Sequence, residues 1–150
     1  MKFVYSDGGR SKYFRAQHVG DCVVRAIALA TGKDYKDVYD DINMLAKKSR
    51  AKSRSSARDG VDPSVSKKYI ESLGWRWHPT CGVGKGVTMH LCDDEIPDGN
   101  LIVRIAGHIV NVKNGIVYDT WDCSQEKVYL YEDGSCKSNY PAVYGYWTKQ

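Results

Sequence analysis

The chain has 150 residues with a formal net charge of +4, and 42% of its residues are apolar while 27% are charged. This composition is typical of one soluble globular domain with a core of its own. No apolar run approaches the roughly 18 residues that a membrane-spanning helix needs, and the N-terminus lacks the apolar segment of a secretion signal. We therefore expect a single complete domain, 1–150, that contacts no membrane and works in the cytoplasm.

The expected elements begin with a short strand at 2–5, which reads KFVY. A helix over 22–31 follows, because Asp21 can cap its first turn and Gly32 comes after its end. Only Arg25 interrupts the apolar surface of this helix. A helix that is apolar on nearly every side is a central, buried one.

Two more helices are expected after it. Asp34 precedes a stripe of apolar residues at helical spacing, namely Tyr35, Val38, Tyr39, Ile42 and Leu45. The next run has Asp62 at the cap, Pro63 at the first helical position and Gly74 beyond its end. The core-facing residues of that third helix would be Val65, Tyr69, Ile70 and Leu73.

The positive charge is concentrated between the second and third helices. Residues 47–68 contain eight Lys or Arg and two Asp, which leaves the rest of the chain with a net charge of −2. A Ser-rich basic stretch at about 47–60 is typical of a solvated loop, but it could also contact nucleic acid or another acidic partner. The candidate contact residues are Lys47, Lys48, Arg50, Lys52 and Arg54.

From Trp75 onward the sequence has the period of strands. Runs of β-branched and aromatic residues alternate with Gly, Pro, Asn and Asp, as in WRWHP, NLIVRI, HIVNVK, GIVYD, KVYLY and AVYGYW. Because helices come first and strands second, we expect an α+β fold in which the helices pack on a C-terminal antiparallel sheet.

One hairpin places two polar residues together. Asn114-Gly115 is the strongest short hairpin signal, and as a two-residue turn it pairs Asn111 with Tyr118. His108, Val110, Asp119 and Trp121 would then share one face. His108 and Asp119 become diagonal neighbours, close enough for an imidazole to bond a carboxylate. Asp122 falls on the opposite face.

The His108–Asp119 pair gives a reason for placing Cys22 at the start of a buried helix. The dipole and free N–H groups at a helix N-terminus stabilise a thiolate, and a neighbouring imidazolium lowers the thiol pKa further. Cys22 can then act as nucleophile, His108 as acid and base, and Asp119 as the group that orients the imidazole. An oxyanion needs donors, which the Cys22 N–H and the Gln17 amide could supply.

The candidate site residues follow one another in a characteristic order: Gln17, Asp21-Cys22, Gly107-His108 and Asp119. In this order the sequence resembles the papain-like cysteine peptidase superfamily, above all its bacteriocin-processing (C39-like) branch. The resemblance implies a papain-like fold over the whole domain. It also implies that Gln17 helps to bind the oxyanion, Cys22 attacks an acyl carbon, His108 is the base and Asp119 orients it. Val23 departs from the branch, which has Gly after the cysteine, so the branch and the substrate stay open. Small phage proteins look similar, and a viral member would work in the host cytoplasm.

Other clusters have simpler interpretations. The five cysteines are an odd number at irregular spacing, which argues against a disulfide framework. His78, Cys81, His90 and Cys92 lack the paired spacing of a zinc site, and 81–86 lacks the spacing of a phosphate loop. We therefore expect neither a metal nor a cofactor. His18 competes with His108 as the base, but no carboxylate is expected beside it.

The sequence thus predicts a thiol-dependent acyl-transfer enzyme, most simply a hydrolase of peptide or isopeptide bonds in a protein or peptide substrate. Deamidation and transglutamination use the same chemistry and remain open. Trp121 would shield the His108–Asp119 pair from water or contact the substrate or a partner, and ordinary packing is an equal alternative for it. The alternative is a non-catalytic papain-like protein that binds nucleic acid or an acidic partner through 47–68.

Overall fold

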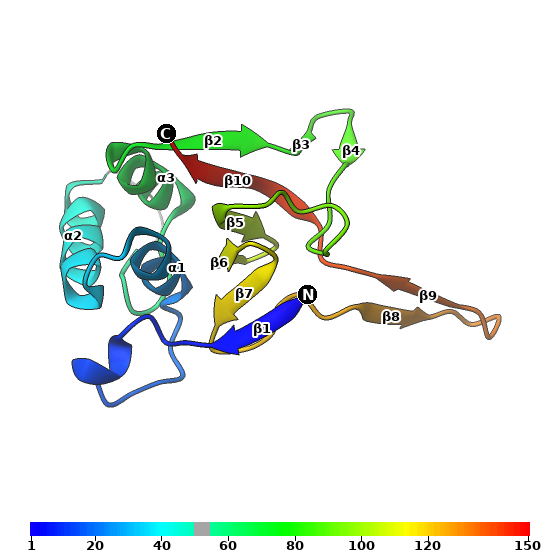
Figure 1. Ribbon diagram of the computed structural model, residues 1–150, viewed down its shortest axis with the longest axis horizontal. Helices are drawn as coiled ribbons and strands as arrows, with labels where there is room; N and C mark the ends of the chain where they lie inside the picture. Colours follow the sequence, from blue (N-terminus) through cyan, green and yellow to red (C-terminus); the bar gives the residue numbers. More distant parts are fainter. Residues whose placement is uncertain (50–54) are drawn as a thin grey trace.

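The computed structural model describes residues 1–49 and 55–150, in which three α-helices lie beside a twisted sheet (Figure 1). The helices are α1 (Cys22–Thr31), α2 (Tyr35–Lys48) and α3 (Pro63–Ser72), and a short 3-10 helix spans Arg10–Lys12. The strands are β1 (Lys2–Tyr5), β2 (Trp75–Pro79), β3 (Cys81–Gly82), β4 (Gly86–Val87), β5 (Asn100–Ile105), β6 (His108–Lys113), β7 (Ile116–Asp119), β8 (Lys127–Leu130), β9 (Cys136–Asn139) and β10 (Val143–Lys149). The α+β class expected from the sequence is confirmed.

Six strands form the main sheet in the order β1-β7-β6-β5-β10-β2. Neighbouring strands are antiparallel except at one edge, where β1 pairs with β7 in parallel. The expectation of a purely antiparallel sheet is therefore wrong at this edge. The N-terminal strand comes before all the helices, and its four exposed residues contain no pattern that indicates a partner.

The central helix α1 packs against β6 and the middle of the sheet. Val24 and Ile27 are completely buried, as expected for an apolar helix, and Gly32 ends it with a left-handed φ of 75°. Asp21 occupies the N-cap position, but its side chain makes no capping hydrogen bond, so the expected cap is wrong. The Asp21 carboxylate instead pairs with the buried Arg25 side chain.

The other two helices begin and face the core largely as the sequence predicts. In α3, the Asp62 side chain accepts a hydrogen bond from the Ser64 N–H at 2.9 Å, and Pro63 is the first helical residue. The Asp34 side chain does not cap α2 and instead accepts a hydrogen bond from the Tyr13 hydroxyl at 2.6 Å. The predicted core-facing residues are buried or partly buried in both helices.

Apolar side chains cover both faces of the sheet. On one face, Ile102, Ile109 and Trp147 join the three helices in a common core. On the other face, Val103 and Val110 pack with side chains of the segment 91–96. The sheet is therefore an interior layer, and its strand ends are the places where polar side chains can meet.

The β6–β7 hairpin has the predicted register. Asn114 and Gly115 form its two-residue turn with φ of 48° and 77°, both in the left-handed region that a type I′ turn requires. Asn111 pairs with Tyr118 and Lys113 with Ile116. His108 begins β6 and Asp119 ends β7, so both residues lie at the open end of this hairpin.

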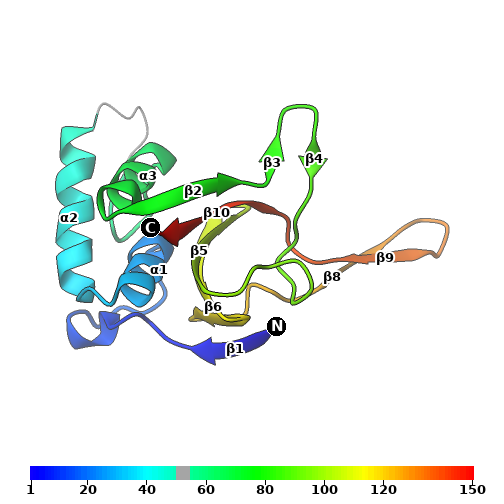
Figure 2. The ribbon, with the colours of Figure 1, turned by 45° about the horizontal axis from the view of Figure 1, so that its top comes forward.

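Two small hairpins extend from the body of the protein. The pairs β3–β4 and β8–β9 form separate two-stranded sheets, and both project away from the helices (Figure 2). The run at 127–131 was expected as a strand, and β8 is one, but it pairs with β9 outside the main sheet.

The basic segment differs from a wholly solvated loop. Lys47 and Lys48 are exposed residues of the last turn of α2, while Arg50, Lys52 and Arg54 lie outside the described residues. Further along, Ala57 is completely buried, and its N–H donates to the Asn43 side chain at 2.9 Å. Within the described chain, none of the helices is long and apolar enough to cross a membrane.

Candidate active site

The predicted catalytic residues meet where α1 starts and the β6–β7 hairpin opens. Cys22 is the first residue of α1, and the thiol takes part in a side-chain hydrogen bond with His108. The Nε2 atom of His108 lies 2.6 Å from Oδ2 of Asp119. The hairpin register thus brings the imidazole and the carboxylate together as predicted, with Asp119 rather than Asp122 as the partner. Since Nε2 faces the carboxylate, Nδ1 is the ring nitrogen left for proton transfer.

The surroundings of Cys22 favour a thiolate. Burial by itself raises the pKa of this thiol, but the hydrogen bond and charge of His108, a backbone hydrogen bond from Ile109 and the charge of Arg25 lower the pKa below its ordinary value. A thiol with a lowered pKa beside an imidazolium and at a helix N-terminus is a nucleophile at neutral pH.

The pKa values of His108 and Asp119 shift in the directions that match a lowered pKa of Cys22. Burial acts to lower the pKa of His108, but hydrogen bonds with Asp119, Cys123 and Cys22 raise that pKa to about 11. Burial acts to raise the pKa of Asp119, yet the hydrogen bond and charge of His108 hold it below its ordinary value. The three shifts have the directions of a thiolate, an imidazolium and a carboxylate that stabilise one another.

A buried arginine joins the two acids of the site. Arg25 is only 5% exposed; its Nη1 pairs with Asp21, and its Nη2 lies 3.1 Å from Oδ1 of Asp119. The Tyr35 hydroxyl donates to Oδ2 of Asp21 at 2.5 Å, and Nη1 of Arg10 donates to the same hydroxyl at 2.8 Å. This network explains why Asp21 does not cap α1: its carboxylate neutralises the arginine that the apolar helix buries.

Sequence reasoning missed the role of Arg25. The helix was expected to be apolar apart from this residue, and a buried guanidinium requires acidic partners. Asp21 lies one helical turn before it, so half of the arrangement could have been found from the spacing of four residues. The contact with Asp119 depends on how α1 packs on the sheet, and the spacing of residues within the helix gives no information about that packing.

The structure places the expected oxyanion donor in a different local contact. Gln17 is half-buried in the loop before α1, and its Nε2 donates to the Phe14 carbonyl at 3.2 Å. Its role as an oxyanion donor stays a prediction. His18, the competing base, is an exposed residue of the same loop.

Trp121 covers the imidazole from the outside. Its ring centroid lies 5.0 Å from that of His108 at an interplanar angle of 42°, and half of the side chain remains exposed. A cavity of about 640 Å³ is lined by these two rings, by other residues of the loop 121–127 and by residues 139–142. This volume is in the range of small-ligand sites. The lining includes His108 but not Cys22.

Two residues beside the cluster carried no signal in the sequence. Cys123 is buried, hydrogen-bonds to His108 and has a pKa raised by burial, which keeps it a neutral thiol. Arg104 lies within electrostatic reach of Cys22, and its Nη2 donates to the Ser66 hydroxyl at 3.1 Å. Both lie on elements whose contact with the site depends on tertiary packing.

One group of possible metal ligands occurs in the described part of the chain. Ligand atoms of His108, Asp119 and Cys123 lie within 4.8 Å of one another. Two of these residues are already bonded to each other. His78 and Cys92, two of the four residues without zinc-site spacing, have other partners. Nε2 of His78 lies 2.8 Å from the Thr148 hydroxyl, and the Cys92 thiol donates to Glu95 at 3.1 Å.

No protein-family model, no curated protein sequence and no solved structure matches this chain. The chemistry of the site is therefore inferred from its own residues and their geometry.

Proposed function

We propose that the protein is a thiol-dependent acyl-transfer enzyme that hydrolyses an amide bond of a protein or peptide substrate. The observation that carries the proposal is the 2.6 Å contact between Nε2 of His108 and Oδ2 of Asp119 beside the Cys22 thiol. The carboxylate bonds Nε2 and so orients the imidazole beside the thiol, which is the arrangement that nucleophilic catalysis by cysteine needs.

The proposed reaction has two steps. The Cys22 thiolate attacks the carbonyl carbon, forming a C–S bond, and the His108 imidazolium gives its proton to the leaving nitrogen as the C–N bond breaks. Water then attacks the thioester, and His108 takes a proton from that water while the thiolate leaves. If the substrate is a side-chain carboxamide, ammonia leaves in the first step. Attack of water on the thioester is then deamidation, and attack of an amine in place of water is transglutamination.

The negative oxygen that develops on the substrate needs hydrogen-bond donors. The backbone N–H of Cys22, at the start of α1, is one candidate, and the Gln17 amide is the other. Gln17 would have to exchange its contact with the Phe14 carbonyl for the oxyanion when the substrate binds.

A papain-like fold is part of the proposal. It is supported by the order of the elements, with a buried helix that begins at Cys22 packed on a mostly antiparallel sheet that carries His108 and Asp119. We place the enzyme in the cytoplasm, because the four cysteines whose side chains are described have free thiols, which a reducing compartment preserves. The proposal includes no metal and no cofactor.

An activated ester tests the proposal without knowledge of the natural substrate. Incubation with p-nitrophenyl acetate should add one acetyl group at Cys22, detected by peptide mass spectrometry after rapid acid quenching. The acetylation should vanish in Cys22→Ala and persist in Cys81→Ser, which removes another half-buried free thiol. Acetylation of all cysteines at similar rates would overturn the proposal.

The second candidate is a binding protein that uses the basic segment 47–68. Its support is the net charge of +6 in this segment, with Lys47, Lys48, Lys67 and Lys68 exposed. Binding of a DNA duplex that weakens steeply with salt, and that is lost on Lys47→Glu/Lys48→Glu, would favour this function. Salt-independent or absent binding would exclude it.

A further inference from the structure

The β8–β9 hairpin, which we call the arm (residues 127–139), has features of a contact surface. In the described chain its strands pair with each other and form a sheet of their own, away from the main sheet (Figure 1). Four consecutive apolar or aromatic residues on it are exposed, Val128, Tyr129, Leu130 and Tyr131. A two-stranded hairpin has no core of its own, and such a group of exposed apolar side chains indicates an interaction site.

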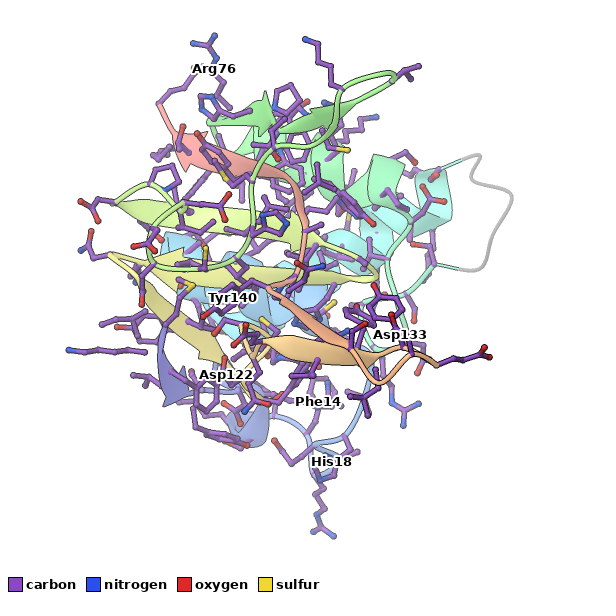
Figure 3. All side chains as sticks on the ribbon, turned by 90° about the vertical axis from the view of Figure 1, so that its right-hand side faces the viewer. Phe14, His18, Arg76, Asp122, Asp133 and Tyr140 are labelled. Carbon is purple, nitrogen blue, oxygen red and sulfur yellow. The ribbon has the colours of Figure 1, made fainter. Side chains whose placement is uncertain are left out.

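The arm is continuous with the proposed active site. The cavity of about 640 Å³ is lined by His108 and Trp121 and also by Tyr129 of the arm and Tyr140 just beyond it. Figure 3, which faces this side of the molecule, shows Asp122 and Tyr140 near the base of the arm. A molecule that fills the cavity therefore touches both the imidazole and the arm.

The two faces of the arm differ in what they contact. Side chains alternate along a strand, and Lys127 and Tyr129 both line the cavity. Val128 and Leu130 consequently point away from it. One face of β8 thus belongs to the cavity that leads to His108, and the other face is available as an internal control.

The chemistry determines which part of a substrate lies in this cavity. The His108 imidazolium gives its proton to the nitrogen that leaves, so the fragment released as an amine is on the His108 side of the thiol. Because the cavity is lined by His108 and not by Cys22, it is placed to hold that fragment. We propose that the cavity and the arm bind an extended polypeptide segment on the amine side of the scissile bond, with an apolar or aromatic side chain against Tyr129 and Tyr140. This inference rests on the proposed function.

Other occupants fit less well. Residues 127–139 contain two acidic and two basic residues, so the arm has no excess of positive charge to attract a nucleic acid. A small amide would fill the space near His108 and leave the arm without a contact. An extended peptide can use the tyrosine rings and also pair with a free strand edge of the arm.

The test is peptide binding by a variant that cannot react. Cys22→Ala protein is applied to an array of acetylated decapeptides, and the Kd of the best binder, labelled with a dye, is measured by fluorescence anisotropy. Tyr129→Ala and Tyr140→Ala, each in the same background, should raise the Kd at least about tenfold, since each removes an exposed ring that the bound peptide would cover. Leu130→Ser, on the far face of the same strand, should leave the Kd unchanged. Tyr140→Ala lies outside β8 and β9, so the test remains valid if Tyr129→Ala disturbs the hairpin.

Three results would overturn the inference. They are the absence of any peptide that binds, a Kd that the two tyrosine variants leave unchanged, and a dimer in sedimentation analysis that Leu130→Ser dissociates. Failure of the proposed function looks different, because a Cys22 thiol without acid-range reactivity can coexist with normal peptide binding. The protein would then be a peptide-binding domain, not an enzyme.

Discussion

Nη2 of Arg25 lies 3.1 Å from Oδ1 of Asp119, and this buried contact joins the helix that begins at Cys22 to the strand that ends at the carboxylate. Oδ2 of the same Asp119 faces His108, so each carboxylate oxygen has its own cationic partner. The arginine also pairs with Asp21, the residue before the thiol. Arg25 is therefore a positioning residue that fixes how the thiol-bearing helix meets the His108–Asp119 pair.

Removal of this arginine should cost stability and disturb the thiol. Arg25→Ala leaves two buried carboxylates without their cation and should lower the free energy of unfolding by about 3–5 kcal/mol, measured in urea. Lys36→Ala is the matched control, because it removes an ion pair at the same helical spacing in which Lys36 is 41% and Asp40 56% exposed. This exposed pair should contribute less than about 1 kcal/mol to the free energy of unfolding.

A conservative variant separates positioning from stability. Lysine cannot bridge two carboxylates as the guanidinium fork does, so Arg25→Lys should fold but shift the pH midpoint of Cys22 alkylation upward. An unchanged midpoint in a folded Arg25→Lys protein would contradict the positioning role.

The Asp119 carboxylate should control the proton on His108. Asp119→Asn keeps the shape of the side chain but removes the charge that raises the pKa of the imidazole, and NMR titration of the His108 ring should show a lower pKa than in the wild type. Alkylation of Cys22 at pH 6 should slow by about tenfold or more, because the imidazolium that stabilises the thiolate is less populated. Asp122→Asn is the control, since Asp122 bonds Ser124 and not the imidazole. Equal effects of the two variants would argue against the assigned pair.

Local signals in the sequence were sufficient where the structure depends on local geometry. Asn114-Gly115 fixed the hairpin register, and with it the contact between His108 and Asp119, because both residues of a type I′ turn need a positive φ. The start of α3 at Pro63 followed from the Asp62 cap for a similar reason. These elements are specified by residues a few positions apart.

Features that depend on packing between distant segments were not predictable in the same way. Asp21 has the position of a helix cap, but the buried Arg25 outcompetes the backbone N–H groups for its carboxylate. Cys123 reaches His108 from the irregular loop after β7, whose path no ladder or turn signal determines. The parallel edge strand β1 and the separate arm are two more cases, since neither strand carries information about its partner.

The pH dependence of stability should reveal the coupled pair. His108 has a raised pKa, so its contribution is full below its ordinary pKa of about 6.5 and is lost as the pH rises toward about 11. Cys22 has a lowered pKa, so its contribution is full above its ordinary pKa of about 8.5 and is lost as the pH falls. Above about pH 8.5 the Cys22 contribution is complete, and only the loss of the His108 contribution still changes the stability.

The stability difference between the wild type and a Cys22→Ala/His108→Gln double variant should therefore fall by about 1 kcal/mol per pH unit above pH 9. Urea unfolding of both proteins at each pH provides the measurement, and ionisable groups that contact neither Cys22 nor His108 cancel in the difference. A difference that keeps rising above pH 9 would show that His108 is not held as an imidazolium.

Gln17 should affect acyl transfer without affecting the thiolate. If its amide binds the oxyanion, Gln17→Ala should slow acetylation of Cys22 by p-nitrophenyl acetate by about 100-fold. Alkylation by iodoacetamide develops no oxyanion on a carbonyl and should keep its rate. Parallel loss of both rates would instead mean that the variant disturbs the loop before α1, where Gln17 bonds Phe14.

The most direct test of the central claim is the iodoacetamide alkylation rate of Cys22 against pH, read by peptide mass spectrometry in the wild type and in His108→Ala. The account predicts that Cys22 alone reacts fast below pH 7 and that His108→Ala removes this reactivity, because the imidazolium lowers the pKa of the thiol. A Cys22 that reacts no faster than Cys81, Cys92 and Cys123, or whose low-pH rate survives in His108→Ala, would contradict the thiolate–imidazolium pair and the acyl-transfer function built on it.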